Sequence, residues 1–201
     1  MGVSCSGQRD NRIIVINGVT AVGKSTLYKL MMAADLLQGK TQLCISHTTR
    51  EPRPHETHGV DYNFVDARTF EDMIAHNKFL EYSKNHNNYY GTSFQELEIA
   101  LQQSNVVLDI DYKGSKNLKN TRLKNKQIFI LITPPDQESF IQRLRDRGTE
   151  TEDQIQTRIK TAKEEMLFFN NSGRFYDYKI CNDNVEKAAK ELEDIVIKFL
   201  K

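Results

Sequence analysis

The fold is decided by the stretch Arg12-Ile13-Ile14-Val15-Ile16-Asn17-Gly18-Val19-Thr20-Ala21-Val22-Gly23-Lys24-Ser25. Its first part is an unbroken apolar run, Ile13 to Ile16, which is typical of a strand buried on both faces. Its second part, Gly18 to Ser25, satisfies the pattern of a phosphate-binding loop, and an amphipathic segment from Lys24 to about Leu37 comes next. Strand, loop and helix occur in the order that this pattern requires, so an ordinary glycine-containing turn is the weaker interpretation.

Similar apolar runs recur along the chain, separated by segments with helical spacing. They are Leu43 to Ile45, Val106 to Ile110, Ile128 to Ile132 and Tyr178 to Cys181. This rhythm predicts an α/β fold with a five-stranded parallel sheet and helices on both faces. The clearest helix is the last, from Val185 to about Phe199, with Asp183 or Asn184 as its N-cap.

Two segments break the rhythm. Residues 47–94 carry short aromatic and polar stretches punctuated by glycine, which indicates a small mixed or antiparallel insertion. Residues 143–171 begin with a polar, arginine-rich segment whose helical hairpin turns near Gly148 and Thr149, and this segment has too little apolar surface for the core. We expect a single domain over residues 1–201, with its core in residues 10–46, 95–142 and 172–201.

Composition limits the class of protein. The 28 Lys and Arg residues nearly balance 27 Asp and Glu residues, so we expect no nucleic-acid partner. Cys5, Cys44 and Cys181 lack disulfide or metal-ligand spacing, which is typical of reduced thiols in the cytoplasm. No apolar run reaches the roughly 18 residues of a membrane span, and the N-terminus lacks a secretory signal. We expect a monomer or a weak homodimer.

The N-terminal sequence Met1-Gly2-Val3-Ser4-Cys5-Ser6 matches the pattern for N-myristoylation at Gly2, with Cys5 available for a second acyl chain. The pattern is short and also arises by chance, so both interpretations stay open.

The phosphate loop predicts a nucleoside triphosphate site. Backbone N–H groups of such a loop, together with the positive end of the adjoining helix, attract phosphates. Lys24 adds a charge near the transferring oxygens, and Ser25 offers a hydroxyl to Mg²⁺, the expected cofactor. The predicted ATP-binding residues of this region are Gly18, Val19, Thr20, Ala21, Val22, Gly23, Lys24, Ser25 and Thr26.

A second motif, Ser46-His47-Thr48-Thr49-Arg50-Glu51-Pro52-Arg53-Pro54, precedes Glu56, Gly59, Asp61, Tyr62 and Phe64. It closely resembles the GMP-site signature of guanylate kinases. The resemblance runs in order from about Ile13 to the C-terminus, through Phe79 to Tyr82, Asn88 to Ser93, Leu108 to Asp111 with Gly114, and Asn182. It implies transfer of a phosphoryl group from ATP to GMP, and to dGMP, in purine metabolism. Residues 47–94 would then bind GMP, and residues 143–171 would form a lid.

The residues of this motif have suitable chemistry. Arg50 and Arg53, held by the stiff Pro52, can present guanidinium groups to one phosphate, and the hydroxyls of Tyr62 and Tyr90 can complete the shell. The alternative, surface arginines in a polar loop, does not explain the two tyrosines.

Base choice is predicted to rest on Glu81 and Thr92. A carboxylate accepts hydrogen bonds from guanine N1–H and N2–H₂, whereas adenine presents a lone pair there, and Thr92 can donate to guanine O6. By resemblance, Ser46 and Asp111 line the same pocket. Asp109 ends an apolar strand, where it would contact GMP and hold Mg²⁺ through water. The weaker alternative is that it caps the next turn, a role that can coexist with the first.

The lid arginines would stabilise charge on the transferring group. By resemblance these are Arg143, Arg147 and Arg158, although an arbitrary charged segment is more often a solvated helix face. With Lys24 and Arg50 they form the predicted catalytic set, and Asn182 matches the family's adenine contact.

Three positions depart from the family pattern. Ala21 replaces a usual glycine, Val19 replaces proline or glycine, and Lys113 replaces glutamine. If the loop needs a positive φ at Ala21, the residue costs up to about 1 kcal/mol.

Two other functions remain open: a guanylate-kinase-like scaffold that binds peptides, disfavoured because Lys24 is present, and a kinase for another nucleoside monophosphate.

Overall fold

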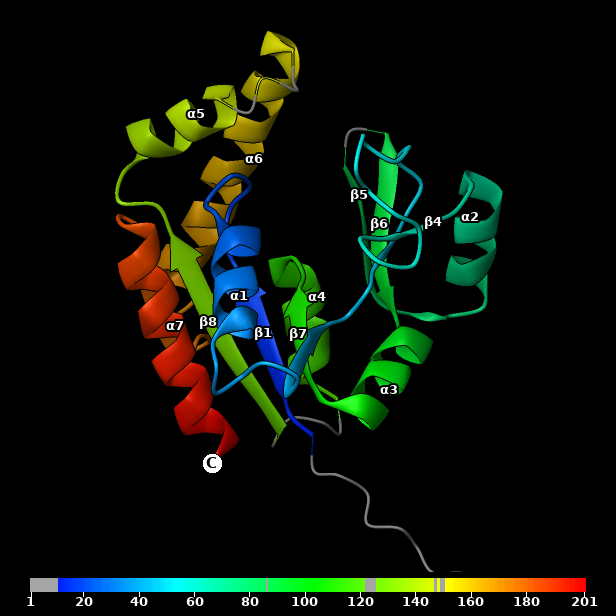
Figure 1. Cartoon of the computed structure of the whole chain (residues 1–201). Helices are drawn as coiled ribbons and strands as arrows, with labels where there is room; N and C mark the ends of the chain where they lie inside the picture. Colours follow the sequence, from blue (N-terminus) through cyan, green and yellow to red (C-terminus); the bar gives the residue numbers. More distant parts are fainter. Residues whose placement is uncertain (1–10, 86, 122–125, 147, 149–150) are drawn as a thin grey trace, which may run out of the picture.

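The computed structural model of the chain describes residues 11–85, 87–121, 126–146, 148 and 151–201. At its centre is a five-stranded sheet in which all neighbouring strands run parallel (Figure 1). In order across the sheet, the strands are β2 (Thr41–Leu43), β7 (Asn105–Asp109), β1 (Ile13–Asn17), β8 (Gln127–Thr133) and β9 (Tyr178–Cys181).

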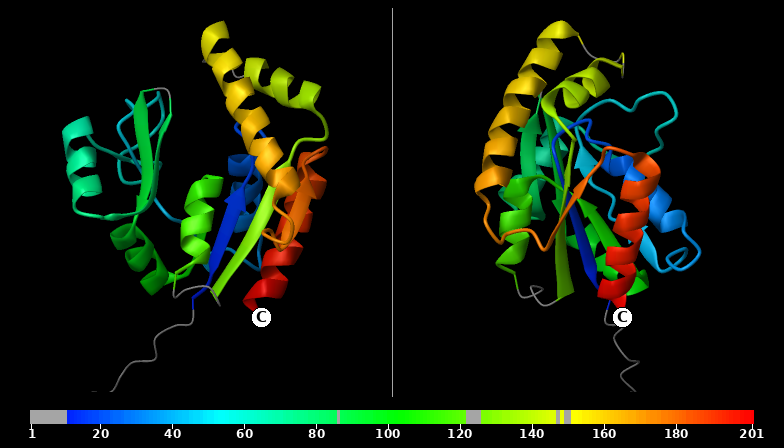
Figure 2. Two further views of the ribbon diagram at one scale, coloured as in Figure 1. Left: turned by 180° about the vertical axis from the view of Figure 1, so that it is seen from behind. Right: turned by 90° about the vertical axis from the view of Figure 1, so that its left-hand side faces the viewer.

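Helices cover both faces of this sheet. In the right-hand view of Figure 2, α1 (Lys24–Ala33) and α7 (Val185–Leu200) lie on one side, and α4 (Tyr112–Lys119) and α6 (Glu152–Asn171) lie on the other. Every residue of β1 is therefore buried, which explains its unbroken apolar sequence. The predicted α/β class, the five-stranded parallel sheet and the two helical layers are confirmed. Asn184 caps α7, since its side chain accepts a hydrogen bond from the Lys187 N–H.

The bounds of two elements differ from the sequence prediction by more than one residue. Strand β2 begins and ends two residues earlier than expected, because Thr41 to Leu43 pair with β7 and the chain then leaves for a second sheet. Helix α1 ends at Ala33, where Ala34 turns into an extended conformation, although Leu37 beyond it is still buried.

The second sheet has four strands, in the order β4 (Asn63–Phe64), β3 (His47–Thr48), β6 (Asn88–Ser93) and β5 (Phe79–Asn85). Strands β3 and β4 run parallel and the other pairs run antiparallel, so the sheet is mixed. A helix that the sequence pattern did not indicate, α2 (Ala67–Ala75), packs against it. Asp66 caps this helix, and its one buried residue, Phe70, stacks on Phe79 and Tyr89.

Helix α3 (Phe94–Gln103) leads the chain back from this lobe to the central sheet. At the opposite side, α5 (Gln137–Asp146) and α6 form the arginine-rich hairpin (Figure 1). This hairpin is more apolar than the sequence pattern indicated, because Ile155, Ile159 and Phe169 of α6 are buried in the core.

The C-terminal half of α6 is tied to α4. The ring of Phe168 stacks on Tyr112 with their centroids 4.5 Å apart, and the Lys116 ammonium lies 4.2 Å from the centre of the Phe168 ring. The Lys119 ammonium lies 4.4 Å from the ring of Phe175, just beyond the end of α6. In the described part of the chain, no helix combines the length and the apolar character needed to cross a membrane.

Candidate active site

The phosphate loop lies between the carboxyl ends of the central strands and the start of α1. Gly18 and Gly23 have φ of 149° and 95°, respectively. A β-carbon at Gly18 would collide with the backbone oxygen of Ile132, and one at Gly23 would lie 2.5 Å from Asn182 Nδ2. Both glycines are therefore needed for close approach as well as for their backbone conformation.

Ala21 has φ of 59°, in the left-handed region. The sequence predicts strain at Ala21 only if the loop needs a positive φ at this position. The loop does have a positive φ there, where this chain has a β-carbon. Such a conformation costs alanine up to about 1 kcal/mol relative to glycine.

Lys24 is held within the loop. Its Nζ donates to the backbone oxygens of Gly18 at 2.7 Å and Val19 at 3.4 Å, and lies 3.7 Å from Asp109 Oδ1. Burial raises the pKa of Asp109, and the neighbouring Lys24 acts in the opposite direction. Ser25, at the start of α1, is exposed, so its hydroxyl is accessible from solvent.

The lid helices already contact the loop. Arg143 of α5 donates to the backbone oxygens of Asn182 at 2.8 Å and Val22 at 3.4 Å. Arg158 of α6 donates to Thr20 Oγ1 at 3.0 Å. The third predicted lid arginine, Arg147, lies outside the described residues.

Asn182 lies directly after β9 and is 1% exposed. Its Nδ2 donates to the Val22 oxygen at 2.8 Å, whereas its buried Oδ1 has no hydrogen-bond donor among the described residues. A buried carbonyl oxygen without a donor is rare, and the exocyclic amine of adenine would supply one.

The predicted guanine pocket lies in the second lobe. Glu81 is 7% exposed, and its Oε1 accepts a hydrogen bond from the Thr92 N–H at 2.8 Å. Burial, and next the Asp111 carboxylate, raise the pKa of Glu81 to about 7, against the opposing effect of the Thr92 hydrogen bonds. The hydroxyls of Ser46 and Thr92 lie 3.0 Å apart. Asp111 caps α4 by accepting from the Gly114 N–H.

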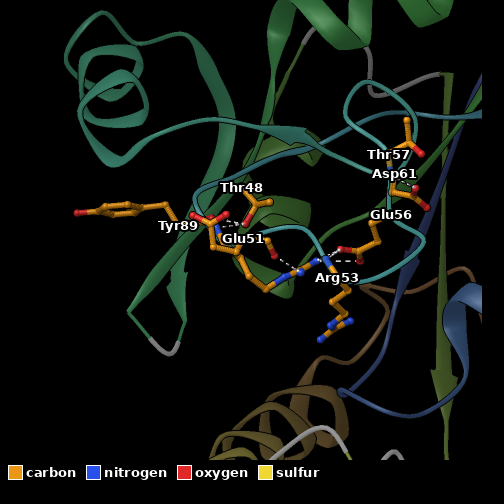
Figure 3. Close-up of polar contacts among 8 residues, drawn as sticks. Thr48, Glu51, Arg53, Glu56, Thr57, Asp61 and Tyr89 are labelled. Atoms are coloured by element: carbon orange, nitrogen blue, oxygen red, sulfur yellow. Dashed lines mark hydrogen bonds and ion pairs between the residues drawn. The ribbon is translucent and has the colours of Figure 1, made fainter.

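The predicted phosphate clamp lies on the same lobe. The Arg50 guanidinium is 5.6 Å from the centre of the Tyr62 ring, and the Tyr62 and Tyr90 rings are 6.2 Å apart. Burial raises the pKa of Tyr62 to about 12, so its hydroxyl keeps its proton and can donate. Arg53 is exposed. Figure 3 shows the polar contacts of this loop, in which Glu56 is central.

Sequence reasoning missed two carboxylates. Glu56 stands out in the sequence only as one residue of a motif, but it forms an ion pair with Arg50 at 2.9 Å. Glu165 lies on α6, and burial raises its pKa to about 7, with Lys24 lowering it and Asp111 raising it further. Because Glu165 and Lys24 are far apart in the sequence, no local pattern could have placed the carboxylate near the loop.

The two sets of charged residues flank the loop from opposite sides. The lobe of β3 to β6 and α2 lies on one side, and the lid of α5 and α6 lies on the other (Figures 1 and 2). A phosphate loop between an arginine-bearing lid and a second arginine-bearing lobe defines a P-loop nucleoside monophosphate kinase.

Comparisons with known proteins give the family. The family model for guanylate kinase matches residues 10–199. The guanylate kinase of Rickettsia felis is 39% identical over 186 residues, which cover 92% of each chain. That of Buchnera aphidicola subsp. Schizaphis graminum is 38% identical over 92% of this chain and 86% of its own. The crystal structure of guanylate kinase from Anaplasma phagocytophilum superposes with a TM-score of 0.68 at 25% identity, over 94% of this chain and 85% of that one. This chain belongs to the guanylate kinase family.

Proposed function

We propose that this chain transfers the γ-phosphoryl group of ATP to GMP, giving ADP and GDP. The buried Glu81 supports GMP as the phosphoryl acceptor. Its carboxylate accepts a hydrogen bond from the Thr92 N–H and lies beside the Ser46 and Thr92 hydroxyls. Guanine offers two adjacent donors, N1–H and N2–H₂, to such a carboxylate, whereas adenine offers a lone pair at N1. Leaving these buried groups unpaired is what would reject the wrong base.

The clamp would hold the GMP phosphate through Arg50, Arg53, Tyr62 and Tyr90. Positioning is the main requirement, because phosphoryl transfer needs the attacking and leaving oxygens roughly in line. An oxygen of the GMP phosphate forms the new bond to the γ-phosphorus while the bond from that phosphorus to the bridging oxygen of ATP breaks. The leaving oxygen stays on ADP.

The phosphate loop and the lid would hold ATP. Lys24 exchanges its contacts with the Gly18 and Val19 oxygens for contacts with phosphate oxygens, and Asn182 accepts from the adenine amine. Arg143 and Arg158 come from helices already against the loop, so they can stabilise the negative charge that spreads over the transferring group. Arg147 would join them.

The residues present suit Mg²⁺. Mg²⁺ prefers oxygen ligands, keeps several waters and is usually held by few protein groups together with substrate phosphates. The exposed hydroxyl of Ser25 and the carboxylate of Asp109, 3.7 Å from Lys24, would be those groups. When bound, the ion neutralises charge on the phosphates of ATP.

The proposed site draws on a single chain. Both nucleotides would be held by groups of one molecule, so a monomer suffices and a weak homodimer is compatible with it.

The reaction consumes ATP, and Cys44 and Cys181 are free thiols, in keeping with the cytoplasm. The N-terminal acylation pattern lies outside the described residues.

A coupled assay of ADP release tests the function. Purified protein receives ATP and Mg²⁺ with GMP, dGMP, AMP, UMP or CMP in turn. We expect activity with GMP and dGMP and, from the buried Glu81, discrimination against AMP by a factor on the order of 10⁴. Equal turnover of AMP would contradict the assigned role of Glu81, and turnover of none would favour the peptide-binding scaffold.

A further inference from the structure

The Arg50 side chain is held on several sides. Its Nη2 donates to both carboxylate oxygens of Glu56, each at 2.9 Å, and its Nη1 donates to the backbone oxygen of Glu51 at 2.6 Å. The ring of Tyr62 lies beside the guanidinium. The Arg50 and Glu56 side chains are only 16% and 17% exposed, so this pair is far less screened than a surface salt bridge.

Glu56 also fixes the second arginine of the clamp. Its Oε2 accepts a hydrogen bond from the backbone N–H of Arg53 at 2.7 Å, and its own N–H donates to the Arg53 oxygen at 3.0 Å. One carboxylate thus joins the side chain of Arg50 to the main chain at Arg53, and Figure 3 labels Glu56 and Arg53.

This arrangement has a consequence for phosphate binding. Arginine is a flexible side chain, and a ligand that must first order it loses affinity. A guanidinium has five N–H donors, so Arg50 keeps donors for a phosphate while Glu56 and the Glu51 oxygen hold it. The charge-assisted hydrogen bonds of Glu56 are of the strong kind that can set such an orientation before the ligand arrives.

We propose that Glu56 is a positioning residue for the GMP phosphate, which presets Arg50 and the backbone of Arg53 in the orientation that receives it. The inference rests on the proposed function, because it takes the ligand of the two arginines to be the phosphate of GMP. It contrasts with a role for Glu56 as an internal anion that competes with the phosphate for Arg50. The two roles predict opposite effects when the charge is removed.

The test compares GMP with guanosine, which shares the base and ribose and lacks the phosphate. Dissociation constants for both are measured by calorimetry for the unmodified protein, for Glu56→Gln and for Glu51→Gln. Glu51→Gln is the matched control, because it removes one negative charge from the same loop while Glu51 contributes its backbone oxygen to Arg50. We expect Glu56→Gln to weaken GMP binding by about tenfold or more and to leave guanosine binding within about twofold. Glu51→Gln should change neither by more than about twofold.

The outcomes are separable. Unchanged or tighter GMP binding by Glu56→Gln would overturn the proposal, and tighter binding would identify the competing anion instead. If Glu56→Gln loses guanosine as well, it reports on folding. Glu56→Asp then decides, because it keeps the charge and should retain a GMP-to-guanosine ratio between those of the unmodified protein and Glu56→Gln. Failure of the unmodified protein to prefer GMP over guanosine would count against the proposed function and not against Glu56 alone.

Discussion

Gly114 of α4 lies against the side chain of Glu81 on β5, so that a β-carbon at position 114 would come within 2.5 Å of the Glu81 Cγ and 2.7 Å of its Cβ. Because the Cβ of Glu81 is fixed by its backbone, the strand or the helix would have to move. The helix that presents Asp111 and the strand that presents Glu81, the carboxylate proposed to bind guanine, therefore set each other's position.

Gly114→Ala tests this contact. Alanine favours a helix, yet its methyl group displaces Glu81, so we expect the KM for GMP to rise about tenfold or more while the KM for ATP stays the same. The control is Asn117→Ala, an exposed position on the same helix, which should leave both constants within about twofold. An unaltered KM for GMP in Gly114→Ala would show that the pocket adapts to the added methyl group.

The raised pKa of Glu81 predicts a pH dependence. Guanine donors favour the ionised carboxylate, and the pKa of this group in the free protein is about 7. Protonation therefore competes with GMP as the pH falls below about 7, and the KM for GMP should rise by up to about tenfold per pH unit. Above about pH 8 it should be constant.

Kinetics between about pH 5.5 and 8.5 check this dependence. The GMP phosphate also titrates, near about pH 6, so Glu81→Gln serves as the reference that retains that titration. The unmodified protein should show the steeper profile. Superimposable profiles, apart from a constant factor, would assign the titration to the substrate.

Lys24 should act mainly in the transition state. We expect Lys24→Ala to lower kcat on the order of 10²-fold or more, because it removes the phosphate-loop cation proposed to stabilise the transferring oxygens. The GMP dissociation constant should be nearly unchanged, since the clamp lies on the other lobe. Lys29→Ala, an exposed lysine on the same helix, is the control. Lost GMP binding with retained kcat would reverse the roles of the two loops.

Domain closure is expected from the placement of the arginines. Arg143 and Arg158 contact the phosphate loop, whereas Arg50 and Arg53 lie on the opposite lobe. The negative charge of the bound phosphates should therefore attract arginines from both sides toward each other. We expect a bisubstrate analogue of ATP and GMP to lower the radius of gyration, and GMP alone to do so only partly. Small-angle scattering of the apo protein and both complexes measures it. An identical radius in all three would indicate a preformed site.

Local sequence patterns were sufficient for the central sheet. Consecutive β-branched residues such as those of β1 identify a strand buried on both faces, and the phosphate loop predicts that a helix comes directly after it. Helix α2 was missed although Phe70, Met73 and Ile74 recur at helical spacing, because its 9 residues are fewer than the window over which such periodicity is counted. A second local signal was the Asp66 cap.

The candidate site likewise has a part that the sequence predicts and a part that only the structure gives. The family resemblance predicted Glu81, Arg50 and Asn182 as site residues because they lie in continuous motifs. It could not give the contact between Glu81 and Gly114, the proximity of Glu165 to Lys24 or the double role of Glu56, because each depends on how separate segments pack. The sequence predicted strain at Ala21 only if the loop has a positive φ there, and the backbone conformation shows that it does.

The aromatic and lysine contacts between α4 and the C-terminal half of α6 give the lid a fixed end. Helix α6 has 20 residues, and at about 1.5 Å per residue it is about 30 Å long. If the predicted closure pivots about this end, Phe168 would be its fulcrum and Arg158 would lie on the arm that moves. A rotation of about 10° about Phe168 would carry the far tip, about 24 Å away, through about 4 Å. A small repacking around Lys116 would thus be magnified into a displacement large enough to bring a guanidinium into or out of hydrogen-bonding range.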